Sequence, residues 1–193
     1  MKYPLITIPK ELDKSFFEMN QIEAQKYLDW VLSIKEERLD ILNKAIRESN
    51  NKEWKFDFSS NSLTPLFDWF RSVIHLRNMT RNEIRIEEEK IKGLLRGYVD
   101  IGVKTFTDET ISICFDVSMY FGEVLRKEKG LNWAFVLKPK RYVEYAQPIL
   151  IKEGINTKLN PRRIIENLAR GILNDEFEED ELIKLYNIWK GYF

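Results

Sequence analysis

The sequence predicts an α+β fold in which helices dominate, with a small β-hairpin or sheet at about 132–151 packed by helices. Three observations lead to this prediction. Apolar residues recur with a helical period along most of the chain, and several of these runs begin at residues that cap helices. Strand-like alternation is concentrated at 132–151. No linker rich in Gly, Pro or Ser divides the 193 residues, so we expect a single globular domain over 1–193.

The first part of this domain, residues 1–107, is expected to be helical after an extended arm. Residues 3–9 carry two prolines, which favour an arm or an edge strand. Asn20 and Glu23 then have the spacing of a capping box. They begin a helix that we expect to continue to about Arg47, because apolar residues keep a helical period at Ala24, Tyr27, Leu28, Val31, Leu39, Leu42 and Ile46.

Three shorter elements complete this part. An extended segment is predicted where aromatic residues alternate with polar ones, at Trp54, Phe56 and Phe58. Thr64 and Pro65 form a cap and first-turn pair that begins a helix. Thr80 and Glu83 again have capping-box spacing. They begin a helix whose apolar positions are Ile84, Ile91, Leu94 and Leu95.

The second part, residues 108–193, is predicted to run helix, strand, strand, helix. Thr107 caps a helix over 108–129, and Gly130 is suited to end it in the left-handed conformation. Residues 132–137 and 142–151 are strand-like, with a turn at 138–141 between them. Two helices follow. One begins at the Asn-Pro pair of residues 160 and 161 and continues to about 173, and the last carries Leu182, Leu185, Tyr186 and Trp189.

Composition limits the class of protein. The chain is 44% hydrophobic and 32% charged, which is typical of a packed globular protein. Its basic and acidic residues both number 31, so it has no net charge to steer a partner. Residues 126–163 hold ten basic and three acidic side chains, and residues 174–193 hold six acidic and two basic. We expect these regions to pair with each other or to face water, since a dedicated nucleic-acid binder is usually basic as a whole domain.

The sequence favours a cytoplasmic protein that does not cross a membrane. Cys114 is the only cysteine, so the chain can form no internal disulfide, which suits a reducing compartment. The first nine residues have too short an apolar run for a signal peptide. No charge-free apolar run approaches the length of about 18 residues that a membrane helix needs.

The candidate site residues begin on the predicted helix over 108–129. Asp116, Tyr120, Glu123 and Lys127 are spaced by three or four residues and therefore share one side of it. Asp116 and Glu123 could form a carboxylate pair for acid–base chemistry or cation binding. They lie about 10.5 Å apart along the helix axis, however, which is too far for one ion without further ligands. We favour the interpretation in which each pairs with a cation of a neighbouring element.

Four further candidates for binding a ligand or a partner come from later elements: Trp133, Tyr145, Gln147 and Arg170. Gly122 lies inside a predicted helix, which indicates close packing of another element, and the Trp133 strand is the expected neighbour. Gln147 falls on the more apolar face of its predicted strand. There it could contact a ligand or, more simply, bind backbone groups near Pro148. We expect Glu123, Tyr145, Gln147 and Arg170 to converge.

Sequence motifs suggest no reaction. The chain has no P-loop, no dinucleotide fingerprint, no zinc-ligand set and no nucleophile elbow. Cys114 stands in no nucleophile motif, and His75, the only histidine, is expected to be a core or boundary residue. We therefore predict no catalytic residues, no metal and no cofactor, and the sequence favours a protein without enzymatic activity.

Four short phrases carry a resemblance to known proteins: Tyr120 to Val124, Trp133, Tyr145 to Pro148, and Asn160 to Gly171. They resemble a group of uncharacterised bacterial proteins with an aromatic-Gly-Glu helix, a Trp strand, a Tyr-x-x-Gln-Pro-like strand and an Asn-Pro helix start. The match covers the last third to half of the chain and implies no activity. In size and mixed composition the chain is also similar to small cytoplasmic immunity proteins of bacterial toxin systems, a likeness at the level of fold alone.

Three functions follow as hypotheses. The first is a non-enzymatic protein that binds another protein, such as a toxin or a complex partner, as an immunity or accessory protein would. It rests on the abundant aromatic residues and the separate charged regions. The second is a small-molecule-binding or hydrolytic domain with a cleft near Glu123, Tyr145 and Arg170. The third is a nucleic-acid binder that uses the basic turn at 138–141, which the neutral net charge disfavours.

Overall fold

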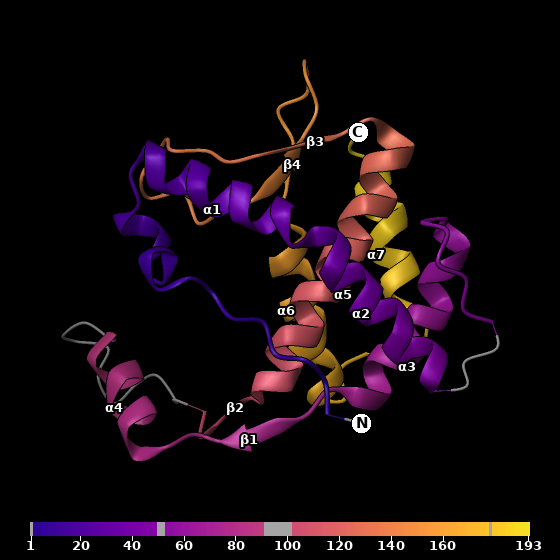
Figure 1. Cartoon of the computed structure of the whole chain (residues 1–193), viewed down its shortest axis with the longest axis horizontal. Coiled ribbons are helices and arrows are strands. Elements are labelled where there is room, and N and C mark those ends of the chain that lie inside the picture. The colour runs from indigo at the N-terminus through magenta and orange to yellow at the C-terminus, as the bar shows by residue number, and fades with distance from the viewer. Residues whose placement is uncertain (1, 50–52, 91–101, 178) are drawn as a thin grey trace.

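The computed structural model describes residues 2–49, 53–90, 102–177 and 179–193, and it confirms a helix-dominated α+β fold. Figure 1 shows α5 (Asp108–Lys129) running through the middle of the molecule. The helices α1 (Gln21–Ser33) and α2 (Lys35–Glu48) follow one another across its front. None of the described helices is long and apolar enough to cross a membrane.

The predicted boundaries of α5 are confirmed. Its cap residue Thr107 accepts a hydrogen bond from the Thr110 backbone N–H at 3.1 Å. Gly130 ends the helix with φ +65°, in the left-handed region that glycine favours. Every residue of 112–125 is buried. A helix that is buried on all sides belongs in the interior of a protein, so α5 is the element around which the other helices pack.

The first predicted helix is two helices. The capping box is present, because Glu23 N–H donates to Asn20 Oδ1 at 3.0 Å and Asn20 N–H donates to Glu23 Oε2 at 2.8 Å. The single helix expected to reach Arg47 was wrong, since the chain changes direction at Ile34 between α1 and α2. The apolar series has no member between Val31 and Leu39, and the helix is interrupted within this gap.

Three more helices surround α5. The helix α3 (Leu63–Val73) begins one residue before the predicted cap Thr64, after a 3₁₀ turn at Ser60–Ser62. The helix α6 (Pro161–Leu173) begins as predicted, with the Asn160 side chain accepting a hydrogen bond from the Arg163 N–H at 3.1 Å. The last helix is α7 (Glu181–Lys190). All three contact α5, and α2 does so as well.

The predicted β element is a three-stranded antiparallel sheet in the order β3-β4-β5. Its strands are β3 (Asn132–Ala134), β4 (Ile149–Ile151) and β5 (Lys158–Leu159), and Trp133 of β3 is opposite Leu150 of β4. The expectation that 142–148 continue the second strand was wrong. These residues form successive turns, with hydrogen bonds from the N–H of Tyr145 to the Tyr142 carbonyl and from the N–H of Gln147 to the Glu144 carbonyl.

A second, two-stranded sheet was not predicted. It pairs β1 (Leu76–Asn78) with β2 (Lys104–Phe106), and α4 (Arg81–Lys90) follows β1. The capping box that begins α4 is confirmed, with the Thr80 N–H donating to Glu83 at 2.7 Å and the Glu83 N–H donating to Thr80 at 3.2 Å. Figure 1 shows α4 standing apart from the helices around α5. The expected apolar positions Ile91, Leu94 and Leu95 lie outside the described residues.

The two predicted extended segments form no strand. Residues 3–9 cross the surface as an arm without regular structure, followed by 3₁₀ turns at Lys10–Leu12 and Phe16–Glu18. The Ile6 N–H of this arm donates to the Ser112 hydroxyl on α5 at 3.0 Å. Residues 54–58 form a loop in which Phe58 has φ +58°. Both segments therefore pack on the core through their side chains and through isolated hydrogen bonds. Neither pairs with a strand.

Candidate functional site

Asp116 is at the centre of a buried group formed by three distant parts of the chain. It is completely buried on α5, and it accepts hydrogen bonds from Arg38 Nε at 2.8 Å and Arg38 Nη2 at 2.7 Å. The Tyr3 hydroxyl also donates to it. Arg38 Nη2 donates in addition to the Pro4 carbonyl at 3.0 Å. This ion pair thus attaches the amino-terminal arm to α2 and α5.

Burial dominates the electrostatics of this group. It raises the pKa of Asp116 from 3.8 to about 6, against the opposing effects of Arg38 and the Tyr3 hydroxyl. Burial and the neighbouring Asp116 carboxylate together raise the pKa of Tyr3. A carboxylate held by two donors of a guanidinium and by a phenol has its strongest acceptor positions occupied. Its geometry therefore suits a structural role.

Tyr120 is also buried and bound internally. Its hydroxyl lies 2.7 Å from the Ser62 hydroxyl and accepts the Phe58 N–H at 3.0 Å. Burial raises its pKa. Aromatic rings surround its own ring, with centroid distances of 4.9 to 5.7 Å to Trp54, Phe56 and Phe58. Tyr120 thus holds the 54–62 segment against α5, and it is not available to a ligand.

Glu123 has its own set of partners. Its carboxylate accepts Arg126 Nε at 3.0 Å and Trp133 Nε1 at 2.9 Å, and Lys35 Nζ lies 3.5 Å away. Glu123 and Asp116 therefore bind different cations on different neighbours, and they form no carboxylate pair. The predicted neighbour of Gly122 is confirmed, because a Cβ atom built there would lie 3.1 Å from the Trp133 ring.

Tyr145 and Gln147 hold the 139–148 loop. The Tyr145 hydroxyl donates to the Met19 carbonyl at 3.3 Å, and its ring stacks on Phe17 with centroids 6.2 Å apart. Gln147 Nε2 donates to the Val143 carbonyl at 2.8 Å, and its Oε1 accepts Asn160 Nδ2 at 2.8 Å. Gln147 would be unusual on the apolar face of a strand, but its side chain binds the backbone of a turn.

Arg170 does not join these residues, so the expected convergence was wrong. It is exposed, and its guanidinium carbon lies 4.8 Å from the ring centroid of Phe106, just before α5 begins. Pro161, at the start of α6, instead lies beside Gly122 in the later half of α5. The two helices therefore run antiparallel, and Arg170 lies at the opposite end of α5 from Glu123.

The residues that do meet leave little space between them. The cavity lined by Trp133, Gln147 and Asn160 has a volume of about 20 Å³, which is room for a water-sized molecule. No buried side-chain nitrogen or oxygen of the described residues lacks a hydrogen-bond partner. Their described His, Cys, Asp and Glu side chains also form no group of three suited to a metal ion. Burial raises the pKa of the Cys114 thiol, so it is not activated as a nucleophile.

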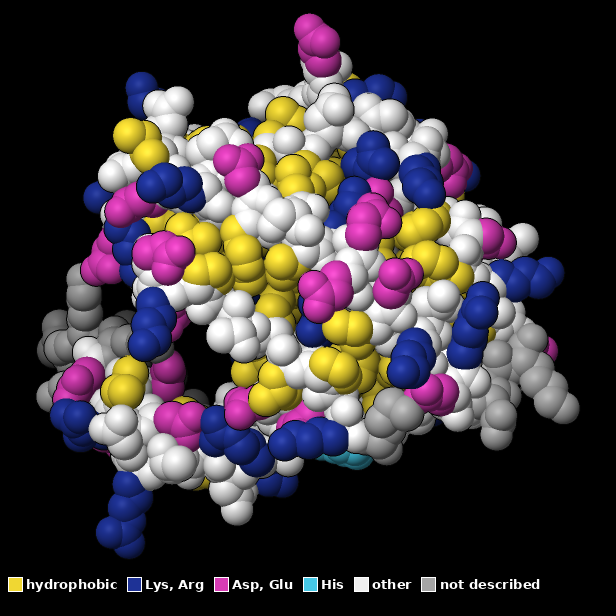
Figure 2. All heavy atoms as spheres, viewed as in Figure 1, with side chains coloured by type: hydrophobic (Ala, Val, Ile, Leu, Met, Phe, Trp, Pro, Cys, Tyr) yellow, Lys and Arg dark blue, Asp and Glu magenta, His cyan; other side chains and the backbone are white. Residues whose placement is uncertain are grey.

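Contacts join the two charged regions, as expected. Lys190 pairs with Glu128, the Tyr186 hydroxyl donates to Glu128, and Lys152 Nζ donates to the Phe193 carbonyl at 3.3 Å. Arg163 pairs within its own region, with Glu144 at 3.3 Å. Figure 2 shows Lys and Arg interspersed with Asp and Glu around hydrophobic side chains in the middle of the face. The basic residues of the turn are exposed, and they have no hydrogen bond or ion pair with any described residue: Lys138, Lys140 and Arg141.

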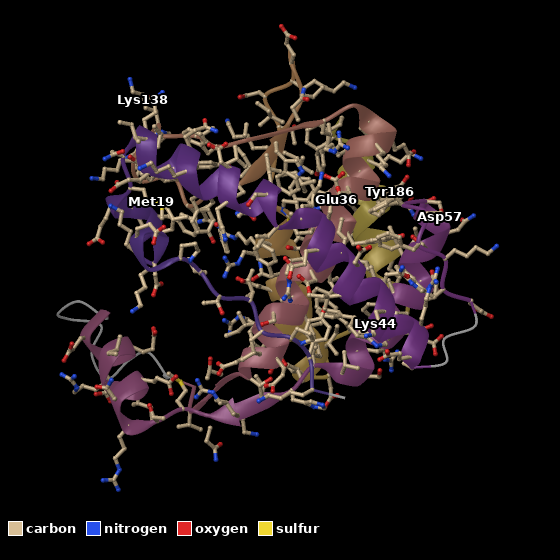
Figure 3. All side chains as sticks on the ribbon, viewed as in Figure 1. Met19, Glu36, Lys44, Asp57, Lys138 and Tyr186 are labelled. Carbon is tan, nitrogen blue, oxygen red and sulfur yellow. The ribbon has the colours of Figure 1, made fainter. Side chains whose placement is uncertain are left out.

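Apolar side chains are exposed on the segments that Tyr145 joins, namely its own loop and the chain around Met19 at the approach to α1. Phe17, which stacks on Tyr145, is 46% exposed, Val143 is 46% exposed and Ile22 is 67% exposed. In the view of Figure 3, Lys138 and Met19 both appear toward the amino-terminal end of α1. We use the name Tyr145 surface for the set of Phe17, Ile22, Lys138, Lys140, Arg141 and Val143. Tyr145 and the basic turn were visible in the sequence, whereas their neighbours at Phe16–Glu18 and on α1 come from the tertiary fold.

Sequence reasoning missed the partners of Asp116. Arg38 carries one signal, since it is one turn before Leu42 on the face of α2 that otherwise bears buried apolar residues. Tyr3 carries none. Comparison of the chain with known proteins finds no family model that matches it, and it finds no matching curated protein or solved structure.

Proposed function

We propose that this protein is a non-enzymatic interaction protein of the immunity or accessory type, which binds an acidic surface of another protein through the Tyr145 surface. One observation carries the proposal: the loop of Tyr145 and the Met19 segment bonded to it bear exposed apolar and aromatic side chains, and the basic turn that leads into this loop bears cations that have no partner among the described residues. Aromatic residues and Arg contribute most to binding at protein interfaces. The proposal includes a bacterial, cytoplasmic setting, and the single cysteine supports the reducing compartment.

Hydrogen bonds within the protein order the loop of the Tyr145 surface in the absence of a partner. The Ala146 N–H donates to the Val136 carbonyl at 2.8 Å, and Asn160 donates to both Gln147 and Glu144. The Tyr145 hydroxyl joins the loop to Met19, at the start of α1. A loop that is already ordered loses less conformational entropy on binding. The internal bonds of Tyr145 and Gln147 thus support binding by their exposed neighbours.

Charge determines the kind of partner. Glu144, the acidic residue of this loop, is engaged by Asn160 and Arg163. The net charge that remains on the turn is positive. An acidic partner would gain association rate and orientation from these rim cations, and the apolar residues would supply most of the affinity.

The other two hypotheses receive less support. A cleft near Glu123, Tyr145 and Arg170 would need these residues to share a cavity, whereas Arg170 lies at the other end of α5. Nucleic acid could use the same basic turn, and it would then bind with a steep dependence on salt. The exposed apolar side chains favour a protein over a phosphate backbone.

The test compares variants in a cross-linked pull-down from the native host. We expect Ile22→Asp to lose the captured partner and Arg141→Glu to weaken its capture. The matched controls are Ile188→Asp, at an isoleucine that is 56% exposed on α7, and Lys104→Glu on β2. Both controls should retain the partner.

The captured protein is then purified and titrated against each variant, alongside DNA and RNA. Equal affinity of Ile22→Asp and Ile188→Asp would refute the Tyr145 surface. Capture that nuclease treatment abolishes would favour the nucleic-acid hypothesis. An immunity role also predicts that co-expression of this protein protects cells from a toxin encoded beside its gene.

A further inference from the structure

A hollow with a mostly apolar lining lies on another part of the molecule. It has a volume of about 640 Å³ and lies between the amino-terminal arm, α2, α3 and the start of α5. Its apolar lining includes the buried side chains Tyr3, Trp69 and Ile113, together with Ile41, Ala45 and Val73. In Figure 3, Lys44 marks the α2 side of this hollow, with α3 beyond it. It shares no residue with the Tyr145 surface.

The wall that the arm contributes is fixed by the buried ion pair. The Tyr3 hydroxyl donates to Asp116, and the Pro4 carbonyl accepts from Arg38 at 3.0 Å. The Tyr3 ring lies 6.3 Å from that of Trp69, tilted by 45°. Arg38 and Asp116 thus hold the arm in a position that leaves the hollow open. Such a preformed site binds without a large cost of ordering.

We propose that this hollow binds a small, neutral, aromatic molecule that carries one hydrogen-bonding group. Its volume is within the range of about 300 to 1,000 Å³ that ligand pockets have, and its lining is mostly apolar with a few polar groups, as in such pockets. Trp69 and Tyr3 line the hollow and supply aromatic groups for contact with a ligand ring.

The polar rim defines the charge of the ligand. Lys2 and Lys44 are balanced there by Glu48 and Glu109, so the rim favours neither an anion nor a cation. His75 is exposed at the rim, and its imidazole makes no hydrogen bond to another described side chain. A neutral imidazole can donate one hydrogen bond and accept another. His75 thus recognises the polar group of the ligand.

The experiment titrates the full chain with 5-fluoroindole and follows both the fluorine signal and the imidazole signal of the protein by NMR. Because His75 is the only histidine, its signal reports this hollow without ambiguity. We expect saturable binding with a dissociation constant below about 1 mM and a shift of the His75 signal. Indole-3-acetate and tryptamine, the anionic and cationic analogues, should each bind at least about tenfold more weakly.

Two serine variants supply the control. Ser72 lines the hollow and Ser33 does not, yet both are exposed, and each hydroxyl donates to the carbonyl of a tryptophan three residues earlier at 2.7 Å. Ser72→Trp should fill the hollow and weaken binding at least about tenfold, whereas Ser33→Trp should leave it unchanged. No shift of His75, or equal binding by both variants, would overturn the site. Tighter binding of a charged analogue would overturn the neutral class.

Discussion

At the scale of residues, the polar side chains inside α5 serve the fold. Asp116, Tyr120 and Glu123 each contact a different neighbour: the arm with α2, the 54–62 loop, and the Trp133 strand. Burying a polar group costs free energy unless it is hydrogen-bonded. Their partners offset that cost, and the same bonds position each neighbouring segment relative to α5.

Asp116 makes the stability of the protein depend on pH. Its pKa is about 6 in the folded state and 3.8 when unperturbed, so between these values the folded protein holds the proton more tightly than the unfolded chain. This contribution is complete below pH 3.8 and is lost as pH rises through about 6. At about 1.36 kcal/mol for each pKa unit, the loss is roughly 3 kcal/mol.

The measurement is urea denaturation of the wild type and of Asp116→Asn from pH 4 to 7. The asparagine does not titrate, and all other groups cancel in the difference between the two curves. We expect the wild type to lose stability relative to Asp116→Asn as pH rises through this window. A difference that is independent of pH would contradict the assigned direction of the pKa.

Glu123→Ala tests whether its cluster is structural. The change removes the acceptor of Trp133 Nε1 and the partner of Arg126. We expect a loss of about 1–3 kcal/mol in the free energy of unfolding, with partner binding unchanged for the fraction that is folded. Glu123→Gln, which keeps an acceptor for Trp133, should lose less. An unchanged melting temperature together with lost binding would show that the cluster belongs to a functional pocket.

At the scale of elements, local hydrogen bonds decided where strands form. Tyr142 to Ile151 has the apolar and aromatic content of a strand, but only Ile149–Ile151 pairs. The preceding residues are held in turns by Gln147 and by Asn160, and Ala146 has φ +58° there. Side-chain bonds to nearby backbone compete with strand pairing. Alternation in the sequence could not reveal this outcome.

Two helical glycines should respond oppositely to alanine. A Cβ at Gly122 would lie 3.1 Å from the rings of Pro161 and Trp133, and these are held by the start of α6 and by Glu123. The three atoms nearest to a Cβ at Gly171, at 1.8 to 2.8 Å, all belong to the Phe177 ring, which would have to turn away and is 40% exposed. Alanine favours a helix by about 1 kcal/mol over glycine. Crowding against fixed groups costs about 1–3 kcal/mol.

We therefore expect Gly171→Ala to be neutral or stabilising by up to about 1 kcal/mol, and Gly122→Ala to be destabilising by about 1 kcal/mol. Thermal unfolding of both variants beside the wild type measures the two changes. Stabilisation by Gly122→Ala would mean that α6 and the Trp133 strand do not approach α5 closely.

At the scale of the whole molecule, the packing is centred on α5. It contacts helices from both predicted parts of the chain, α2 and α3 from residues 1–107 and α6 and α7 from residues 108–193. No described residue of α4 belongs to the hydrophobic core, and Ile86 on this helix is 40% exposed. The division of the chain into one domain over 1–193 stays a prediction.

Amide hydrogen exchange should follow this arrangement. We expect the slowest exchange in the middle of α5, at the free energy of global unfolding, because residues 112–125 are buried. Exchange in α4 should be much faster, since few apolar contacts hold it. Mass spectrometry of the exchanged and digested protein gives both values. Equal protection of the two helices would show that α4 packs more firmly than these contacts indicate.

Helix ends could be predicted from the amino-acid sequence, because capping acts between residues a few positions apart. The capping signals of Asn20 with Glu23, of Thr107 with Gly130, and of Asn160 are all local patterns. The partners of the buried polar groups, in contrast, depend on the tertiary structure. Tyr3 and Asp116 meet across 113 positions of the chain, and the antiparallel packing of α6 on α5 separates Arg170 from Glu123. Such contacts arise from the packing of whole helices and strands, and local sequence patterns do not encode that packing.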